Sequence, residues 1–279
     1  MSFRPSKQLG QNFLVNQGIV AKIIAAANLS EGDTVLEVGP GTGTLTEELI
    51  KYAGHVVAIE KDKQLFDLLQ EKFRGAKNLE LISADILRYN LQITKYKLIA
   101  NIPYNITGQI FHNFLLAKNR PSMIIVMVQK EVGERLLGKN KSILSLAASL
   151  YGRAEKVCDV SPGSFNPPPK VTSMVVKMVA NSSPRRGEVG RDLIINPPHP
   201  SFSEGGSPEM DFEMERRTMQ IAKIGFSSRR KKLVSNLSTG LKISKEKLSA
   251  VFGEIGLDEN VRAEELDKDD WLKLAKNIG

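Results

Sequence analysis

The segment Asn101-Ile102-Pro103-Tyr104 carries the most specific chemistry in the sequence. Proline fixes φ and has no N–H, so the neighbouring carbonyl groups can be held in a rigid turn. An asparagine side-chain oxygen and the carbonyl of Ile102 or Pro103 can together accept both hydrogens of an exocyclic amine, and the ring of Tyr104 offers a face on which a base can stack. The segment therefore predicts an amine-recognition site, against the alternative of an ordinary turn.

Three glycines at alternate positions, Gly39, Gly41 and Gly43, follow the strand-like segment 34–38. Glycines at a strand-to-helix turn let the backbone approach a ligand closely. A dinucleotide fingerprint, G-x-G-x-x-G, would need glycine at position 44, where this chain has Thr44. NAD is therefore not the favoured ligand, and a tight turn without any ligand is the alternative.

Two acidic residues follow later strand-like segments. Glu60 closes the segment that begins at His55, at the separation from the glycines expected for an acid that accepts hydrogen bonds from ribose hydroxyls. Asp85 follows the next such segment and could accept a hydrogen bond from an adenine amine. Either acid alone is typical of a solvated loop or a helix cap. Together they favour a nucleoside cofactor without a pyrophosphate, and S-adenosylmethionine fits that description.

An alternation of strand-like and helix-period segments must position these residues. Strands are expected at 34–38, 55–59, 79–82, 97–100, 123–128 and 172–179, and helices after Asn16, near Leu45, and at 62–73, 109–117 and 144–151. This pattern predicts an α/β fold, a Rossmann-like parallel sheet with helices on both faces. Its strand ends would deliver the glycines, the acids and Asn101 to one edge.

The pattern stops at residues 181–209, where fourteen of twenty-nine residues are Ser, Pro or Gly. We therefore expect a catalytic domain at 1–180, a flexible linker or insertion at 181–210, and a small helical, partly basic domain at 211–279. Helices are expected in the last domain at 214–226, 229–237, 245–252 and 269–278.

Composition restricts the class of protein. The 279 residues are 41% hydrophobic and 25% charged, which excludes wholesale disorder and a collagen-like fibre. No apolar run approaches the roughly 18 residues of a membrane-spanning helix, and no secretory signal is evident, so we expect a soluble cytoplasmic protein. One cysteine, Cys158, cannot form an internal disulfide, and three scattered histidines predict no metal site.

Positive charge is concentrated near the C-terminal end. The chain has 39 Lys and Arg against 31 Asp and Glu, and residues 216–247 hold ten of the basic residues against one acid, Glu246. Such a patch attracts a polyanion such as RNA. A solvated helix face is the alternative reading of the same run.

Six ordered motifs together resemble those of the ribosomal RNA adenine dimethyltransferase family. They are Gly10-Gln11-Asn12-Phe13-Leu14, Glu37-Val38-Gly39-Pro40-Gly41-Thr42-Gly43, Asn101-Ile102-Pro103-Tyr104-Asn105, Gln129-Lys130-Glu131-Val132, Phe165-Asn166-Pro167-Pro168-Pro169-Lys170-Val171 and Phe226-Ser227-Ser228-Arg229-Arg230-Lys231. The resemblance covers nearly the whole chain. It implies the Rossmann-like sheet of class I methyltransferases, and N6,N6-dimethylation, with S-adenosylmethionine as methyl donor, of two adjacent adenosines near the 3′ end of small-subunit ribosomal RNA.

The resemblance also implies roles for single residues. The cofactor-binding residues would be Asn12, Leu14, Gly39, Gly41, Glu60, Asp85 and Asn101, and the catalytic ones Asn101, Ile102, Pro103, Tyr104 and Phe165. Phe165 would be a second apolar wall of the base pocket, or else a core aromatic before a turn. The RNA-binding residues would be Arg216, Arg217, Arg229, Arg230, Lys231 and Lys232. The partner would be small-subunit RNA or its assembly intermediate, and the protein a monomer.

Three alternatives stay open at this point. One is a resistance-type methyltransferase acting on large-subunit ribosomal RNA, and another is a protein-glutamine methyltransferase, whose similar motif has proline where this chain has Ile102. The third is a non-catalytic assembly factor for the small subunit that keeps the fold. The chain departs from the family pattern mainly at 181–209, which bears on how the two domains are placed.

Overall fold

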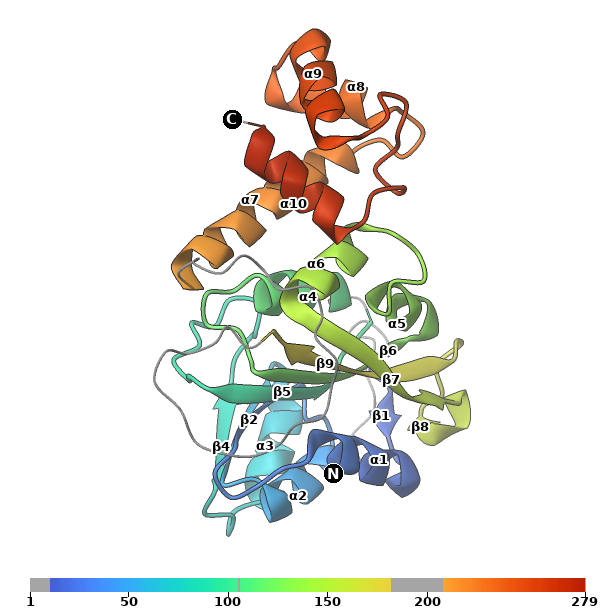
Figure 1. Ribbon diagram of the computed structural model, residues 1–279. Coiled ribbons are helices and arrows are strands. Elements are labelled where there is room, and N and C mark those ends of the chain that lie inside the picture. The colour runs from blue at the N-terminus through green and yellow to red at the C-terminus, as the bar shows by residue number, and fades with distance from the viewer. Residues whose placement is uncertain (1–10, 105, 182–207, 279) are drawn as a thin grey trace, which may run out of the picture. The chain divides into compact units, whose positions relative to one another are not determined.

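The computed structural model describes residues 11–104, 106–181 and 208–278. These residues fall into two compact units, divided in the sequence between Ala180 and Asn181 (Figure 1). Each unit has its own buried core. Most of the linker or insertion predicted at 181–210 lies outside the described residues. Within the described ranges no helix is long and apolar enough to cross a membrane.

A seven-stranded sheet forms the centre of the first unit, in the order β4-β3-β2-β5-β6-β9-β7. Its strands are β2 (Thr34–Val38), β3 (His55–Glu60), β4 (Leu79–Ser83), β5 (Tyr96–Asn101), β6 (Met123–Gln129), β7 (Gly152–Val160) and β9 (Ser173–Ala180). The strands from β4 to β6 pair in parallel, and β9 is antiparallel to both β6 and β7. The predicted Rossmann-like sheet is confirmed, with one antiparallel strand inserted near its edge.

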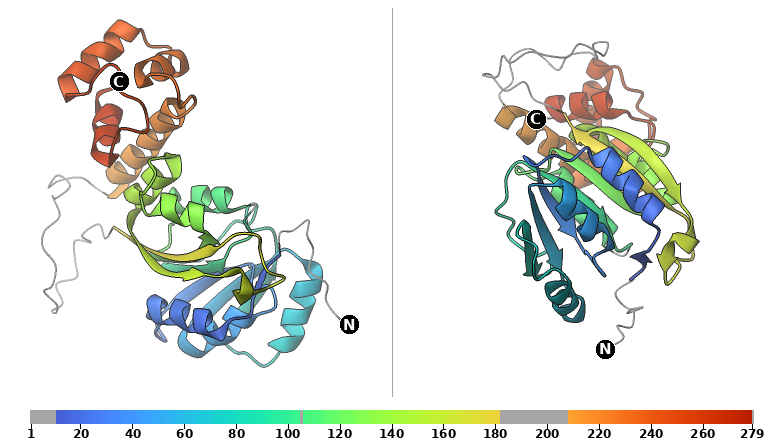
Figure 2. Two further views of the ribbon diagram at one scale, coloured as in Figure 1. Left: turned by 90° about the vertical axis from the view of Figure 1, so that its right-hand side faces the viewer. Right: turned by 90° about the horizontal axis from the view of Figure 1, so that it is seen from below.

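Helices cover both faces of this sheet (Figures 1 and 2). Helices α1 (Gln17–Ala27), α2 (Thr44–Tyr52) and α3 (Lys63–Lys72) lie on one face, and α4 (Thr107–Leu115), α5 (Lys130–Leu136) and α6 (Ile143–Tyr151) lie on the other. Local sequence sets where they begin: the Asn16 side chain accepts the first free N–H groups of α1, and Asp62 does the same for α3.

The central strands are buried on both faces, which explains their nearly continuous apolar sequences. Val35, Leu36, Leu98 and Ile99 are each at most 1% exposed. Strand β7 lies at the edge and differs: four of its nine residues are charged, and only Val160 is buried. Its sequence therefore lacks the alternation of apolar and polar residues that indicates a strand, and no strand was predicted there. The short helix α5 was missed as well.

A second, two-stranded sheet joins distant parts of the first unit. Strand β1 (Phe13–Leu14) pairs antiparallel with β8 (Phe165–Asn166), which follows a short 3-10 turn at Pro162–Ser164. The N–H of Val15 donates to the carbonyl of Ser164 over 2.9 Å and extends this pairing. The segment before α1 is therefore fixed to the proline-rich turn more than 140 residues later.

The second unit is a group of helices (Figure 1). It contains α7 (Pro208–Gly225), α8 (Leu233–Leu241), α9 (Lys245–Ile255) and α10 (Lys268–Asn277). Trp271 is 1% exposed and stacks on Phe226 with the ring centroids 5.6 Å apart, and Phe252 is fully buried. The predicted helical domain therefore has a compact core of its own.

The helix predicted at 229–237 is wrong in its start. Residues 229–231 form a turn, and α8 begins at Leu233. The buried side chain of Asn236 holds this turn, because its amide donates to the carbonyl groups of Gly225 and Ser228 over 2.7 and 2.9 Å. None of the four consecutive basic residues has an apolar side chain that could pack against the core of the unit. The helix therefore starts at Leu233, whose side chain is buried.

Candidate active site

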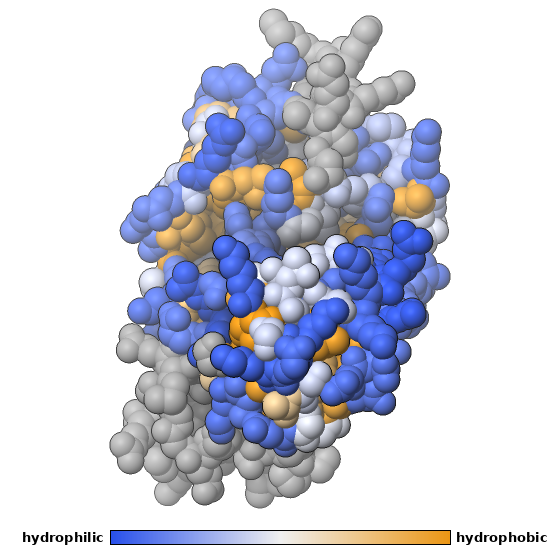
Figure 3. Space-filling model, turned by 90° about the horizontal axis from the view of Figure 1, so that it is seen from above, coloured by the Kyte–Doolittle hydropathy of each residue, from blue (hydrophilic) through white to orange (hydrophobic). Residues whose placement is uncertain are grey.

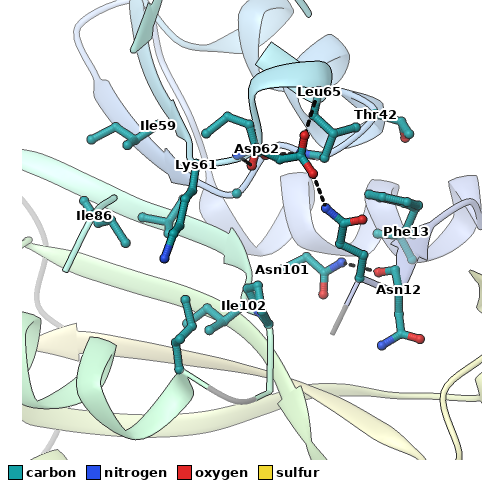
Figure 4. A pocket seen from close by; sticks show the side chains of 18 of the residues that line it. Asn12, Phe13, Thr42, Ile59, Lys61, Asp62, Leu65, Ile86, Asn101 and Ile102 are labelled. Carbon is teal, nitrogen blue, oxygen red and sulfur yellow. Dashed lines mark hydrogen bonds between the residues drawn. The ribbon is translucent and has the colours of Figure 1, made fainter. Parts of the chain in front are cut away.

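A pocket opens at the carboxyl ends of the parallel strands of the first unit (Figure 4). Four strand ends and the segment before α1 contribute to it. Its lining includes Gln11–Leu14, Val38, Gly39, Gly41, Thr42, Ile59–Asp62, Ala84–Ile86, Asn101–Tyr104 and Ile106. Every predicted cofactor-binding residue is among them. This is the crevice in which open α/β sheets bind ligands.

The glycine turn after β2 has backbone angles that only glycine adopts without strain. Gly41 has φ +61°, and a Cβ atom there would lie 2.9 Å from the ring of Phe13. Glycine thus lets Phe13 lie directly on the turn. The N–H of Gly41 points to the carboxylate of Glu60, 3.2 Å away. The turn and the end of β3 are therefore held together.

Glu60 is 6% exposed at the end of β3. One carboxylate oxygen accepts the N–H of Gly41, and the other accepts the N–H of Asp62 over 2.9 Å. Burial raises the pKa of Glu60, and the backbone N–H groups oppose that shift. Each oxygen keeps a further lone pair, so the fixed carboxyl group can still accept hydrogen bonds from a pair of ligand hydroxyls.

Asp85 lies just after β4 and is paired with a lysine that belongs to none of the sequence motifs. The ammonium of Lys61 is 2.9 Å from one oxygen, and the N–H of Leu87 is 3.0 Å from the other. The hydrogen bond from Lys61 lowers the pKa of Asp85, against a smaller effect of burial. Asp85 is thus an ionised acceptor, and a ligand amine that reached it would share it with Lys61.

Asn101 ends β5, and its side chain has a defined orientation. Its amide nitrogen donates to the main-chain carbonyl of Asn12 over 3.1 Å (Figure 4). The amide oxygen is therefore the group left for a ligand, and it is an acceptor. The segment before α1 thus contributes to the site by fixing the amide group, besides lining the pocket.

The turn after Asn101 offers two main-chain carbonyls as acceptors for a ligand, those of Ile102 and Pro103, and they differ in their hydrogen bonds. The carbonyl of Pro103 accepts the N–H of Ile106 and the hydroxyl of Thr107, each over 3.2 Å. It is therefore occupied by the start of α4. The sequence left the choice between Ile102 and Pro103 open, and the structure favours the carbonyl of Ile102 as the second acceptor.

Tyr104 lines the pocket beside this turn. Its phenol and the hydroxyl of Ser173 are 2.5 Å apart and share a hydrogen bond. Burial raises the pKa of Tyr104, and the bond to Ser173 opposes the shift. The ring is thus neutral and half-buried, as a stacking surface should be.

Phe165 is placed differently from the predicted pocket wall. Its side chain is 4% exposed, belongs to the apolar core, and is not among the residues that line the pocket. Phe165 lies opposite Leu14 in the pairing of β8 with β1, and both belong to the same apolar core. The structure therefore brings together all of the predicted site residues of the first unit except Phe165.

The second unit presents a group of cations on the turn before α8. Arg229, Arg230, Lys231 and Lys232 are all exposed, and Lys232 donates to the side chain of Asn260. Figure 3 shows that hydrophilic side chains surround small apolar patches on the face seen from above. Arg216 and Arg217 are exposed on α7, but Arg217 also donates to the carbonyl of Ile278 and so helps to hold α10.

Among the described residues, no group of three or more His, Cys, Asp or Glu could hold a metal ion.

Comparison with known proteins gives one consistent family. Residues 2–188 match the family described as ribosomal RNA adenine dimethylase. A protein named ribosomal RNA small subunit methyltransferase A from Dehalococcoides mccartyi (strain CBDB1) is 41% identical, over 98% of this chain and 88% of the relative. One of the same name from Thermosynechococcus vestitus is 37% identical, over 98% and 96%.

Solved structures agree with this result. A dimethyladenosine transferase from Plasmodium falciparum superimposes with a TM-score of 0.73 at 27% identity, covering 94% of this chain and 95% of that one. The 23S rRNA methyltransferase ErmE superimposes with a TM-score of 0.68 at 25% identity, covering 96% and 99%.

A second buried carboxyl group lies behind the pocket and was not selected from the sequence as a site residue. Glu37 is 1% exposed in β2, and the hydroxyl of Thr46 donates to it over 2.7 Å. Burial raises its pKa from 4.5 to about 8, with a contribution from the nearby Glu60 and against the effect of Thr46. Glu37 is therefore protonated in the folded protein at neutral pH.

Because Glu37 is buried, we predict that the free energy of unfolding falls as the pH rises from about 4.5 to about 8. In that window the unfolded chain releases the proton of Glu37 and the folded protein keeps it, which favours unfolding by up to about 1.4 kcal/mol per pH unit. Glu37→Gln removes this titration. Between pH 5 and pH 8 its free energy of unfolding should therefore rise by about 2–4 kcal/mol relative to that of the wild type. Guanidinium unfolding at several pH values measures the difference.

The exposed Glu254→Gln on α9 controls for the loss of one negative charge. If the wild type and Glu37→Gln show the same pH dependence, Glu37 is ionised in the folded state and the expectation is contradicted.

Proposed function

The chain belongs to the ribosomal RNA adenine dimethylase family, and we propose that it uses S-adenosylmethionine to dimethylate N6 of two adjacent adenosines near the 3′ end of small-subunit ribosomal RNA. The main support is the orientation of Asn101. Its amide oxygen is left as an acceptor beside the carbonyl of Ile102, in a pocket whose other end has the features of an adenosine site.

The pocket fits S-adenosylmethionine in chemistry and in arrangement. Glu60 has two fixed oxygens for the ribose hydroxyls, and Asp85 is an ionised acceptor for the adenine amine. The turn of Gly39 and Gly41 leaves room for close approach of the ligand to the backbone. Asn12 and Leu14 line the pocket from the segment before α1. When bound, the cofactor supplies a methyl group on a positively charged sulfur.

Asn101 and Ile102 prepare the acceptor nitrogen. The lone pair of an adenine amine is delocalised into the ring, which makes the amine a poor nucleophile. Hydrogen bonds from its two hydrogens to the oxygen of Asn101 and the carbonyl of Ile102 favour a more tetrahedral nitrogen with a localised lone pair. Holding that nitrogen within about 3–3.5 Å of the methyl carbon supplies much of the remaining rate advantage. No protein nucleophile is required.

Tyr104 defines which adenosines can react. Its half-buried ring would stack on the target base, and this requires the base to leave any helical stack of the RNA. Unpaired or loop adenosines are therefore the accessible targets. The second methylation requires the same pocket to accept N6-methyladenine.

The cations of the second unit would bind RNA phosphates. The exposed residues of the turn 229–232, with Arg216 on α7, can neutralise phosphates without reading sequence. We also propose that the protein works as a monomer. We place the enzyme in the cytoplasm, together with ribosomal subunits that are being assembled.

A large-subunit substrate is the second candidate, because the fold of the 23S rRNA methyltransferase ErmE covers 96% of this chain. The names of the more similar relatives favour the small subunit. A substrate comparison separates the two candidates.

The purified protein should transfer label from S-adenosylmethionine to unmethylated small ribosomal subunits and produce N6,N6-dimethyladenosine. Digestion of the RNA and quantification of the modified nucleoside measure this product, with large subunits as a parallel substrate. Label in the large subunit alone would favour the resistance type of enzyme. Tight binding of the small subunit without any label would favour an assembly factor.

Asn101→Ala should abolish methyl transfer, a loss of about 10²-fold or more, because the amine loses its side-chain acceptor. Binding of the RNA should be retained, since phosphate contacts dominate affinity. Asn119→Ala is a matched control, because this amide lies in the loop before β6, at the opposite end of the sheet. Transfer at the wild-type rate by Asn101→Ala would refute the proposed role of Asn101.

The double variant Arg229→Gln and Arg230→Gln should weaken RNA binding and make it less sensitive to salt. The slope of log affinity against log salt should fall by about 0.7–0.9 for each phosphate that the variant no longer neutralises. Lys273→Gln with Lys276→Gln, two exposed positions on α10, removes the same charge elsewhere in the unit. Titrations at several salt concentrations compare the variants, and an unchanged slope for the arginine variant would indicate a merely solvated surface.

A further inference from the structure

We propose that Ser173 is a positioning residue that holds the ring of Tyr104 in the orientation required for stacking on the target base. The inference rests on the proposed function of the same pocket and adds a residue that lies outside all six sequence motifs. Ser173 is the first residue of β9, and its hydroxyl shares a hydrogen bond with the phenol of Tyr104.

Ser173 is itself rigidly held. It is fully buried, and it lies in register with Gln129 of β6 on one side and with Val160 of β7 on the other. A strand paired on both sides cannot shift without breaking two ladders of backbone hydrogen bonds. The hydroxyl of Ser173 is therefore a fixed point for the far end of the tyrosine side chain.

The near end of Tyr104 is fixed by the turn that carries it. Pro103 restricts the backbone before it, and the carbonyl of Pro103 is bound by Ile106 and Thr107 at the start of α4. With both ends held, the ring cannot rotate away from the pocket without losing a buried hydrogen bond. A base that enters the pocket thus meets an ordered surface and does not have to order it on binding.

The strand gives Ser173 no structural reason to be polar. The five residues that follow in β9 are Met174, Val175, Val176, Lys177 and Met178, which are apolar except for Lys177. A buried hydroxyl destabilises a strand unless it has a partner, and among the described residues the side chain that bonds to this hydroxyl is Tyr104. We therefore assign Ser173 to the tyrosine and through it to the base pocket.

Three variants test the proposal: Ser173→Ala, Tyr104→Phe, and the two combined. Ser173→Ala should lower kcat/KM for RNA about tenfold, the effect of one lost hydrogen bond, with the affinity for S-adenosylmethionine unchanged. Tyr104→Phe keeps the ring and removes the same bond, so it should give a similar loss. The combined variant should be no worse than either single one.

Ser122→Ala is the control. Ser122 lies just before β6, at the opposite end of the sheet, and its hydroxyl donates to the carbonyl of Tyr96. It should keep the wild-type kcat/KM. Multiplying losses in the combined variant, or an unchanged kcat/KM in Ser173→Ala, would overturn the proposal. So would a joint loss of cofactor affinity and thermal stability, which would indicate a general structural role.

A measurement without RNA separates this proposal from the proposed function. The chain has five tyrosines, so labelling with 3-fluorotyrosine gives five fluorine resonances, of which Tyr104→Phe identifies one. Ser173→Ala should move that resonance alone, and Ser122→Ala should leave it in place. If the resonance moves but the wild type methylates no ribosomal RNA, the function is wrong and the hydrogen bond stands. If the resonance does not move, the positioning role fails whatever the substrate.

Discussion

The parallel pairing of β2 with β3 and β5 is the constraint on which the site depends. Glu37 of β2 lies opposite Ala58 of β3 and Ile99 of β5, so the three strands end at nearly the same level. The glycine turn, Glu60 and Asn101 consequently emerge side by side at one edge. A shift of one residue in either pairing would also turn every side chain of the shifted strand to the opposite face, which the two buried faces do not allow.

Buried polar groups give this edge its rigidity. Glu60 is fixed by two backbone N–H groups, Asn101 by the carbonyl of Asn12, and Tyr104 by Ser173. In the described ranges no buried side-chain nitrogen or oxygen lacks a hydrogen-bond partner. Fully paired polar groups in a low-dielectric interior have few alternative arrangements. The acceptors proposed for the amine are therefore oriented before a ligand arrives.

The two units carry different parts of the proposed activity. The first unit contains every residue that lines the pocket and thus the proposed chemistry. The second unit has a small core around Trp271 and exposes cations on the turn before α8. Phosphate binding requires exposed, flexible charges, and methyl transfer requires a fixed and partly dehydrated pocket. Separate cores allow each requirement to be met without affecting the other.

The sequence by itself determined the sheet, the helical second unit, and the positions that face the pocket from the strand ends, because burial on both faces and the turn glycines leave a periodic and local signal. It did not reveal the edge strand β7, whose polar residues lack that signal, and it began α8 four residues too early. Only the tertiary structure decided that Phe165 packs in the core, that Lys61 pairs with Asp85, and that Ser173 holds Tyr104. These contacts join residues 24 to 151 positions apart, and no local pattern in a single sequence encodes which distant side chains meet.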